Sequence, residues 1–314
     1  MAVRSSSQQA TLANALASGS CRDAPADVSS GVEQGKAVLA EAASAYRHAL
    51  GERLVGAYAL GSLAHGGFSS LVSDVDLGLI LAEPLHASDA DTIHQVGETL
   101  KAQGSALHER LSVFWGTPST LGGQQAGGRF PPLDRLDLIQ HGLLIDGLDT
   151  RRDLAQPSRV DVLVAGAEFA LDYLAGIRLS ESYSGSPDSA QDDAAEQIRR
   201  PELLLARGIR RATKLVLFPA RFLYSAETGL VGTNLAAVDY YLACDQAPGA
   251  GLVAAALAWR TSPPDHIEAT ALLKNGMIPL YVHYIDDHIA RLTAVGRLDI
   301  ADAFAKWLKQ ITDA

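Results

Sequence analysis

The spacing of apolar residues changes along the chain, and each change predicts a different element. Over Val32–Leu50 apolar residues recur every three or four positions, which indicates an amphipathic helix. The Ser- and Ala-rich segment 1–30 lacks such a pattern over most of its length, and we expect it to be a weakly ordered tail. The next segments indicate buried strands at Leu54–Leu60, Val75–Leu81 and Arg110–Trp115, with a helix at Asp89–Gln103.

Beyond residue 157 the strand patterns stop. A Gly- and Pro-rich loop at Gly116–Pro132, and a short helix followed by an apolar segment at Asp134–Ile145, close the part that contains strands. A polar loop is expected at Ser182–Asp193. This layout predicts an α+β domain at 31–157, with a mixed sheet and flanking helices, followed by an all-α helical-bundle domain at 158–314. The later segments with helical spacing are Arg159–Leu179, Ala194–Phe218, Leu235–Cys244, Leu252–Trp259, Ile267–Lys274 and Ile278–Val295.

Composition narrows the classes of function. The 314 residues carry 26 basic and 36 acidic side chains, a net charge of −10. General binding to nucleic acid is therefore disfavoured, because phosphate contacts need positive charge. No apolar stretch reaches the roughly 18 residues of a membrane span. The two cysteines, Cys21 and Cys244, are too few for a disulfide scaffold, so a cytoplasmic protein is expected.

The segment that follows the first predicted strand carries the most informative chemistry. Gly61 and Ser62 form a turn, eleven residues lie between Ser62 and Asp74, and Asp74 and Asp76 then open the second strand. Residues two apart in a strand point to one face, so the two carboxylates should lie together. Such a pair suits Mg²⁺, which binds through carboxylates plus substrate phosphates. The glycine allows close approach of a phosphate, and the serine offers a hydroxyl donor.

This segment resembles the nucleotidyltransferase superfamily, which includes DNA polymerase beta and the streptomycin and spectinomycin adenylyltransferases. The signature is Gly-Ser, about a dozen residues, and Asp-x-Asp between apolar residues. Here it is Gly61-Ser62 with Ser73-Asp74-Val75-Asp76-Leu77. The resemblance implies a nucleoside triphosphate, most simply ATP, bound at Gly61, Ser62 and Ser73. It also implies Mg²⁺ on Asp74 and Asp76, which would be both metal ligands and catalytic residues.

A second resemblance lies in the helical part. The segment 220–229 (ARFLYSAETG) is similar to a helix of the streptomycin and spectinomycin adenylyltransferases in which an arginine contacts the triphosphate, and this implies that role for Arg221. The family usually has lysines after this helix, but this chain has Leu230-Val231-Gly232-Thr233-Asn234. Arg207, Arg210, Arg211 and Lys214 are spaced for one helix face and could replace them. Of these, Arg210 and Lys214 are predicted to contact the nucleotide.

The third strand departs from the family pattern. The antibiotic adenylyltransferases carry there a carboxylate that acts as general base, whereas Ser112 falls at that position here. Neutral serine is a poor base near pH 7. Glu109 is close in sequence, but its parity points it to the opposite face. Three later carboxylates could fold back toward the site, namely Asp134, Asp137 and Asp146.

These observations predict a Mg²⁺-dependent nucleotidyltransferase. It would move a nucleoside monophosphate to an acceptor hydroxyl, most simply on a small molecule, and release pyrophosphate. A basic helix face argues against a polycationic aminoglycoside as acceptor. Two alternatives stay open: a catalytically impaired nucleotide-binding or regulatory protein, favoured by Ser112, and a transferase acting on a protein or nucleic acid, favoured by the local basic patch.

Overall fold

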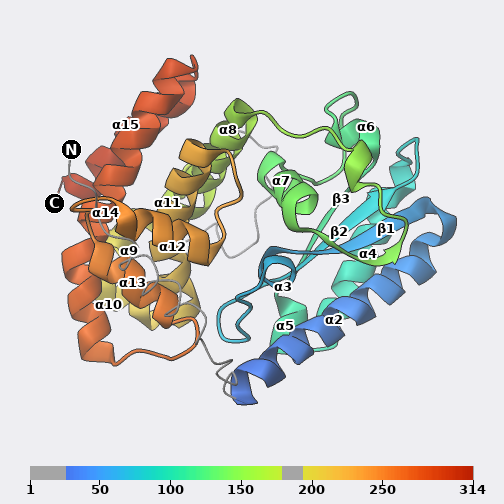
Figure 1. Cartoon of the computed structure of the whole chain (residues 1–314), viewed down its shortest axis with the longest axis horizontal. Coiled ribbons are helices and arrows are strands. Elements are labelled where there is room, and N and C mark those ends of the chain that lie inside the picture. Colours follow the sequence, from blue (N-terminus) through green and yellow to red (C-terminus); the bar gives the residue numbers. More distant parts are fainter. Residues whose placement is uncertain (1–25, 179–193, 314) are drawn as a thin grey trace, which may run out of the picture.

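The computed structural model describes residues 26–178 and 194–313, and it contains one four-stranded sheet (Figure 1). The strand order is β3-β2-β1-β4. β1 pairs antiparallel with β2 and β4, whereas β2 and β3 are parallel, so the sheet is mixed. The strands are β1 Leu54–Leu60, β2 Val75–Leu81, β3 Leu111–Gly116 and β4 Leu143–Gly147.

The first part of the chain, which we call the sheet half, surrounds this sheet with helices. Alternate side chains of β2 explain the arrangement. Leu77 and Leu79 are fully buried in a core with α2 and α4, whereas Ile80 belongs to a second core with α7. Asp76 shares the parity of Ile80, so it faces the α7 side of the sheet. The helices are α2 Ala26–Leu50, α3 Gly61–His65, α4 Ala87–Lys101, α5 Ala106–Glu109, α6 Pro118–Leu121 and α7 Pro132–His141, with single turns of 3₁₀ helix at Gly51–Arg53 and Arg151–Asp153.

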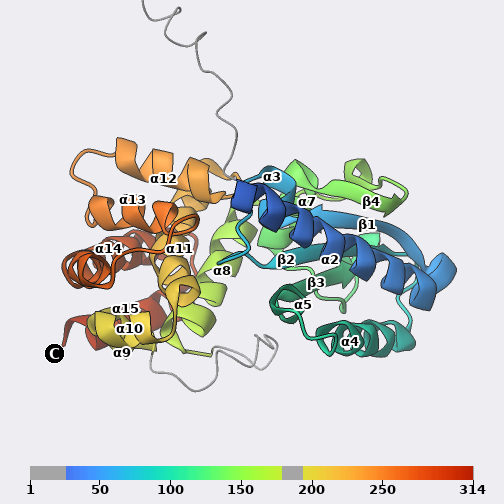
Figure 2. The same ribbon diagram turned by 90° about the horizontal axis from the view of Figure 1, so that it is seen from below.

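The described residues after β4 form no strand, and from α8 onward they make a helical half beside the sheet half (Figure 2). Its largest apolar core joins α8, α11, α14 and α15. The buried hydroxyl of Tyr281 donates to the carbonyl of Leu215 at 2.8 Å and ties α14 to α11. The helices are α8 Arg159–Ala170, continued by a π-helical turn at Leu171–Ala175, then α9 Ala194–Arg199, α10 Pro201–Ala206, α11 Ile209–Thr228, α12 Asn234–Ala243, α13 Ala250–Ala258, α14 His266–Ala294 and α15 Leu298–Thr312.

In the sheet half the predicted strands are confirmed, and β1 and β2 have the predicted bounds. Four details differ. The segment Gly116–Pro132, expected to be a loop, contains the short helix α6. Residues 26–30 already belong to α2, whereas weak order was expected there, and the preceding 25 residues lie outside the described part. The apolar segment after α7 is a fourth strand, β4. Glu109 ends α5 and is not part of the third strand, so the parity argument about it was wrong.

In the helical half the predicted ends of the helices were less accurate. The single helix expected at 194–218 is three helices, because Pro201 and Gly208 begin new ones. Around Pro279, by contrast, two separate helices were predicted, but the structure has one continuous helix, α14. The amphipathic helix α15 was not predicted. The expected loop at 182–193 lies outside the described residues. No helix within 26–178 or 194–313 is both long and apolar enough to cross a membrane.

Candidate active site

A small cleft of about 90 Å³ lies where the sheet half meets the helical half. We call it the interface cleft. The sheet half lines it with the turn after β1, the start of β2 and the loop between them, and the helical half lines it mainly with α11. From the sheet half it is lined by Gly61, Ser62, His65, Ser73, Asp74 and Asp76. The polar and charged lining residues of the helical half are Thr213, Lys214, Arg221, Asn234 and Arg260.

The turn at Gly61 brings the two sides of the motif together. Leu60 is paired with Asp76 across β1 and β2, and Gly61 follows with a φ of +58°, a conformation that favours glycine. A methyl group at this position would collide with the Asp76 carboxylate. The Gly61 N–H donates to the Oδ2 atom of Asp137, at 2.6 Å. Gly61 therefore lies between a carboxylate of β2 and a carboxylate of α7.

Asp76 has no ion-pair partner among the described residues. It accepts no hydrogen bond from the residues that the structure describes, and burial, Asp74 and Asp134 together raise its pKa to about 8. Burial likewise raises the pKa of Asp134 to about 7, with a further contribution from Asp137. A cation bound beside Asp76 would reverse this effect, because it would favour the ionised carboxylate.

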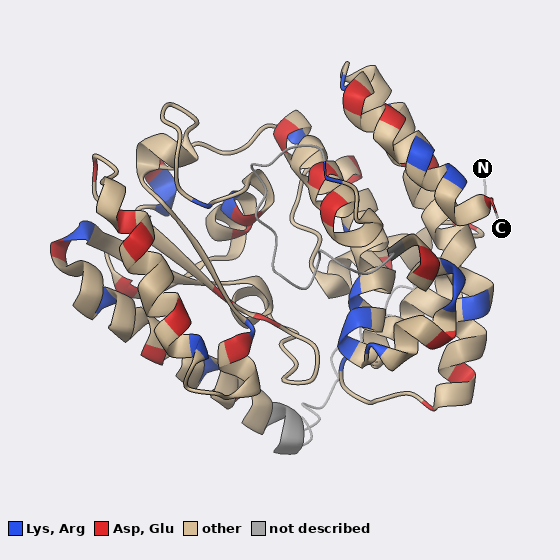
Figure 3. Cartoon of the chain, turned by 180° about the vertical axis from the view of Figure 1, so that it is seen from behind, with Lys and Arg blue, Asp and Glu red and all other residues tan. Residues whose placement is uncertain are grey.

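Asp74, by contrast, is already paired. Its Oδ1 atom accepts from Arg210 Nη2 and its Oδ2 atom from Lys214 Nζ, each at 2.5 Å. Burial opposes ionisation of Asp74, but Lys214 and Arg210 outweigh it and hold its pKa below the usual value. Basic segments of the helical half that face the sheet half are visible in Figure 3. Arg210 and Lys214 therefore do lie opposite the two carboxylates of the motif.

Arg260, which the sequence analysis missed, fixes the loop that leads into Asp74. It is 9% exposed, and its Nη2 atom donates to the Gly67 carbonyl at 2.7 Å and to Ser73 Oγ at 3.1 Å. The Ser69 hydroxyl donates in return to the Arg260 carbonyl. On the other side of the loop, Arg110 donates to the carbonyls of Ser70 and Ser73. Ser73, one of the predicted nucleotide-binding residues, is thus held by both halves.

Arg221 also lines the cleft. Its Nε atom donates to the Gly232 carbonyl at 2.5 Å, and its guanidinium lies 5.2 Å from the centre of the Phe218 ring. Burial lowers the pKa of Arg221, and the negative charges of Asp137 and Asp76 oppose that effect. Arg221 is thus a cation of α11 that lines the same cleft as Asp76.

The other sequence expectations have mixed outcomes. Ser112 is in register with Asp76 on the parallel neighbour β3, so it lies on the expected face of the sheet, but it does not line the interface cleft. Asp134 and Asp137 fold back to the site on α7, whereas Asp146 pairs with Arg47 instead, at 2.6 Å. Helix α7 was predicted, but nothing in the sequence specified which of its carboxylates would face Gly61.

The basic residues of α11 do not form one uniform face. Arg207 follows the last residue of α10 as its C-cap and lies outside α11. Arg211 turns into the helical half, where its guanidinium lies 4.7 Å from the Tyr173 ring and donates to Gln197. The predicted set of four thus divides, and two of its members, Arg210 and Lys214, contact Asp74.

The two carboxylates of the motif, Asp74 and Asp76, fit a divalent cation only if other ligands complete its coordination. Among the described residues no group of three or more His, Cys, Asp and Glu side chains is placed to hold a metal ion. Two carboxylates suffice for Mg²⁺ when substrate phosphates and water complete its coordination. Asp76, without a hydrogen-bond donor and beside further carboxylates, is the observation that favours a cation at this place.

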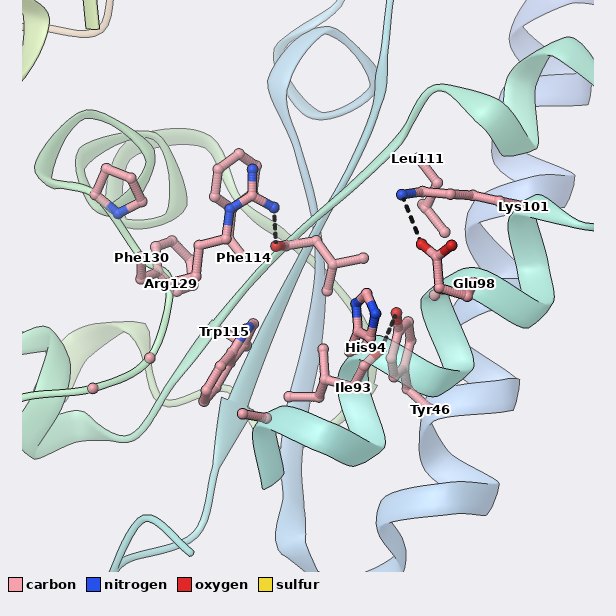
Figure 4. A pocket seen from close by; sticks show the side chains of 16 residues that line it. Tyr46, Ile93, His94, Glu98, Lys101, Leu111, Phe114, Trp115, Arg129 and Phe130 are labelled. Carbon is pink, nitrogen blue, oxygen red and sulfur yellow. Dashed lines mark hydrogen bonds and ion pairs between the residues drawn. The ribbon is translucent and has the colours of Figure 1, made fainter. Parts of the chain in front are cut away.

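A second cavity, a larger groove of about 620 Å³, lies elsewhere on the sheet half (Figure 4). It runs between α4 and the edge strand β3. Apolar side chains such as Ile93 and Trp115 line it together with charged ones such as Glu98 and Arg129. None of the predicted site residues lines it. The smaller interface cleft is therefore the better candidate for the active site, because the chemistry is there.

Comparison with known proteins supports the fold. The sequence matches no protein-family model and no curated protein. The structure is similar to spectinomycin adenyltransferase AAD(9) from Enterococcus faecialis, solved with ATP and spectinomycin. The TM-score is 0.50 at 13% sequence identity, over 76% of this chain and 96% of that chain. The resemblance to nucleotidyltransferases that the Gly-Ser and Asp-x-Asp motif predicted is thus confirmed at the level of the fold.

Proposed function

We propose that the protein is a nucleotidyltransferase that uses a nucleoside triphosphate, with Mg²⁺ as cofactor, to modify a hydroxyl group of a small molecule. One observation carries this proposal: Gly61-Ser62 and the carboxylates of Asp74 and Asp76 line the same cleft as several cations of the helical half. A structural neighbour that contains ATP and spectinomycin is consistent with such a substrate pair.

The triphosphate would bind across the cleft. Among the residues that line the cleft, the three cations Lys214, Arg221 and Arg260 outnumber the two carboxylates of the motif. This local excess contrasts with the net charge of −10 for the chain. Positive side chains suit a polyanion because they neutralise its charge, and the Ser62 hydroxyl adds a hydrogen-bond donor.

In the proposed reaction, an oxygen of the acceptor hydroxyl attacks the α-phosphorus. The bond from that phosphorus to the bridging oxygen of the β-phosphate breaks, and pyrophosphate leaves while the hydroxyl proton passes to a base or to water. Asp74 and Asp76 would hold Mg²⁺, which supplies charge neutralisation on the phosphates. Phosphoryl-type transfer depends mainly on positioning and charge, so Arg210, Lys214 and Arg221 would be the main contributors from the helical half.

The acceptor should not be a polycation. An aminoglycoside carries several ammonium groups, and the helix that faces the motif presents Arg210 and Lys214 to the cleft. Like charges that meet across a binding site are costly, so these residues select against such an acceptor. A neutral or anionic small molecule with a free hydroxyl fits the site better.

A nucleotide-binding protein without transferase activity is the second candidate. Two observations favour it: Ser112 stands in register with Asp76, where the family places a carboxylate, and Asp74 is paired with two cations. Incubation of the protein with each of the common nucleoside triphosphates, Mg²⁺ and a panel of neutral and anionic hydroxyl compounds separates the two. Pyrophosphate release that depends on the acceptor supports the transferase, whereas binding of nucleotide without release supports the alternative.

A further inference from the structure

The two cations on Asp74 take both of the carboxylate oxygens through which Asp74 would hold a metal ion. Arg210 and Lys214 are four residues apart on α11 and so project from the same face of the helix. Each takes a different oxygen of the carboxylate, Oδ1 for Arg210 and Oδ2 for Lys214. A divalent cation on either oxygen would lie close to two positive charges in a partly buried site, where repulsion is weakly screened.

We infer that Arg210 and Lys214 are exchangeable counter-ions, which pair with Asp74 while the cleft is empty and move to the triphosphate when it binds, so that metal ion and nucleotide bind together. This inference rests on the proposed function, since it takes Asp74 as a metal ligand and the cleft as the triphosphate site. In the absence of nucleotide, the same two side chains exclude the metal ion from Asp74.

The surroundings allow this exchange without a change of the backbone. Residues of α11 next to the two cations, such as Leu215 and Val216, are fully buried in the helical core, so the helix itself is fixed. The Arg210 and Lys214 side chains are 35% and 18% exposed, and both are long and flexible. A triphosphate in the cleft offers them more anionic oxygens than one carboxylate does.

Arg260 shows what a fixed cation looks like in the same cleft. Its guanidinium donates to a backbone carbonyl and to the Ser73 hydroxyl, and it is 9% exposed. Its backbone carbonyl also accepts from the Ser69 hydroxyl, so both the side chain and the backbone of Arg260 are bound to the loop before Asp74. Arg210 and Lys214 instead pair with a carboxylate that would gain a metal ion in exchange.

The inference makes an unusual prediction, namely that one substitution has effects of opposite sign on the two ligands. Lys214→Gln removes a charge that repels a metal ion from Asp74, so Mn²⁺ should bind the nucleotide-free protein roughly tenfold more tightly than it binds wild type. The same substitution removes a partner of the triphosphate, so a non-hydrolysable ATP analogue with saturating Mg²⁺ should bind roughly tenfold more weakly. Arg210→Gln should act in the same way.

The experiment measures both affinities on the full chain, Mn²⁺ by electron paramagnetic resonance without nucleotide and the ATP analogue by calorimetry. Arg211→Gln is the matched control, because it removes the same charge one residue away from Arg210 but on a side chain that faces Tyr173, and it should change neither affinity. Asp74→Asn in the Lys214→Gln background should abolish the gained Mn²⁺ affinity. Circular dichroism checks the fold of each variant.

The outcomes separate the inference from the proposed function. Tighter Mn²⁺ binding together with weaker nucleotide binding, in at least one of the two variants, supports the exchange. If wild type binds the Mg²⁺–nucleotide complex but neither variant gains Mn²⁺ affinity, the exchange is wrong and the proposed function stands. If wild type does not bind the nucleotide with Mg²⁺ at all, the proposed function is wrong and the exchange fails with it.

Discussion

Asp74 and Asp89 are both paired with arginine at 2.5 Å, but their surroundings differ in one respect. Asp89, near the start of α4, accepts from Arg53 of the same half and from the backbone N–H of His86 at 2.8 Å. Asp74 has ion-pair partners from α11 of the other half, and both are side chains rather than backbone groups. Arg53 and the helix N-terminus together lower the pKa of Asp89 against the effect of burial.

The difference separates a structural ion pair from a functional one. Asp89 is satisfied by its own half, including a backbone donor that cannot leave, so its role is to anchor α4. Asp74 depends on charges that cross the interface cleft, so its surroundings change if the cleft accepts an anion or a cation. The two ion pairs are chemically similar, but we expect only the pair at Asp74 to respond to ligands. Four substitutions in and around the two sites test this difference.

The largest effect should come from Asp76→Asn, which removes a carboxylate of the proposed metal site while keeping its shape. Transfer should fall by at least about a hundredfold, because charge on the phosphates is no longer neutralised. Pyrophosphate release at saturating Mg²⁺ measures it. Asp89→Asn is the matched control and should keep wild-type activity per folded molecule. Equal losses in both variants would mean that the loss does not arise at the proposed metal site.

Ser112→Glu should come next. It introduces a carboxylate in register with Asp76, on the face where the resemblance to the streptomycin and spectinomycin adenylyltransferases predicts a base. A general base contributes about 10²–10⁴-fold, and we expect a gain in transfer near the lower end of that range at saturating Mg²⁺. The comparison is the rate with the same acceptor at several pH values. An unchanged rate and pH profile would show that a group other than a strand carboxylate accepts the proton.

Asp89→Asn should affect stability instead. Loss of a charge-assisted hydrogen bond beneath α4 should cost about 2 kcal/mol at pH 7. Because the pKa of Asp89 in the folded state lies below its usual value of 3.8, this contribution is present above that value and is lost as the pH falls through the lower, folded value. Urea unfolding of both proteins at pH 7 and at acid pH should show a difference that shrinks in acid. A constant difference would contradict the assignment.

The smallest effect should follow from Arg260→Lys. Lysine keeps the charge but cannot hold both the Gly67 carbonyl and Ser73 Oγ as the planar guanidinium does. The loop before Asp74 should loosen, and the KM for the triphosphate should rise about tenfold while kcat changes less. Steady-state kinetics with a fixed acceptor measures both constants. A fall in kcat alone, with KM unchanged, would place Arg260 in the chemical step instead.

The sequence predicted the sheet half better than the helical half for a physical reason. Strand β1 is a short, mostly apolar segment that ends just before Gly61, and β2 is a similar segment that begins just after Asp74. Their local sequence pattern therefore agrees with their place in the sheet. The motif residues are also close in sequence, which makes their meeting predictable. The partners from the other half depend on packing. Arg260 lies in a turn after an apolar helix, and no sequence pattern around it indicates its contact with Ser73. Helix α14 continues through Pro279, which the local sequence alone does not predict.

Transfer of label from a nucleoside triphosphate marked at the α-phosphate tests the central claim most directly. Wild type and Asp76→Asn would be incubated with Mg²⁺, the labelled triphosphate and a fractionated pool of small polar metabolites. We predict that wild type forms a labelled small-molecule product together with an equal amount of pyrophosphate, and that Asp76→Asn forms almost none. If no labelled product appears with any nucleoside triphosphate, or if Asp76→Asn forms as much as wild type, nucleotidyl transfer at this cleft is contradicted.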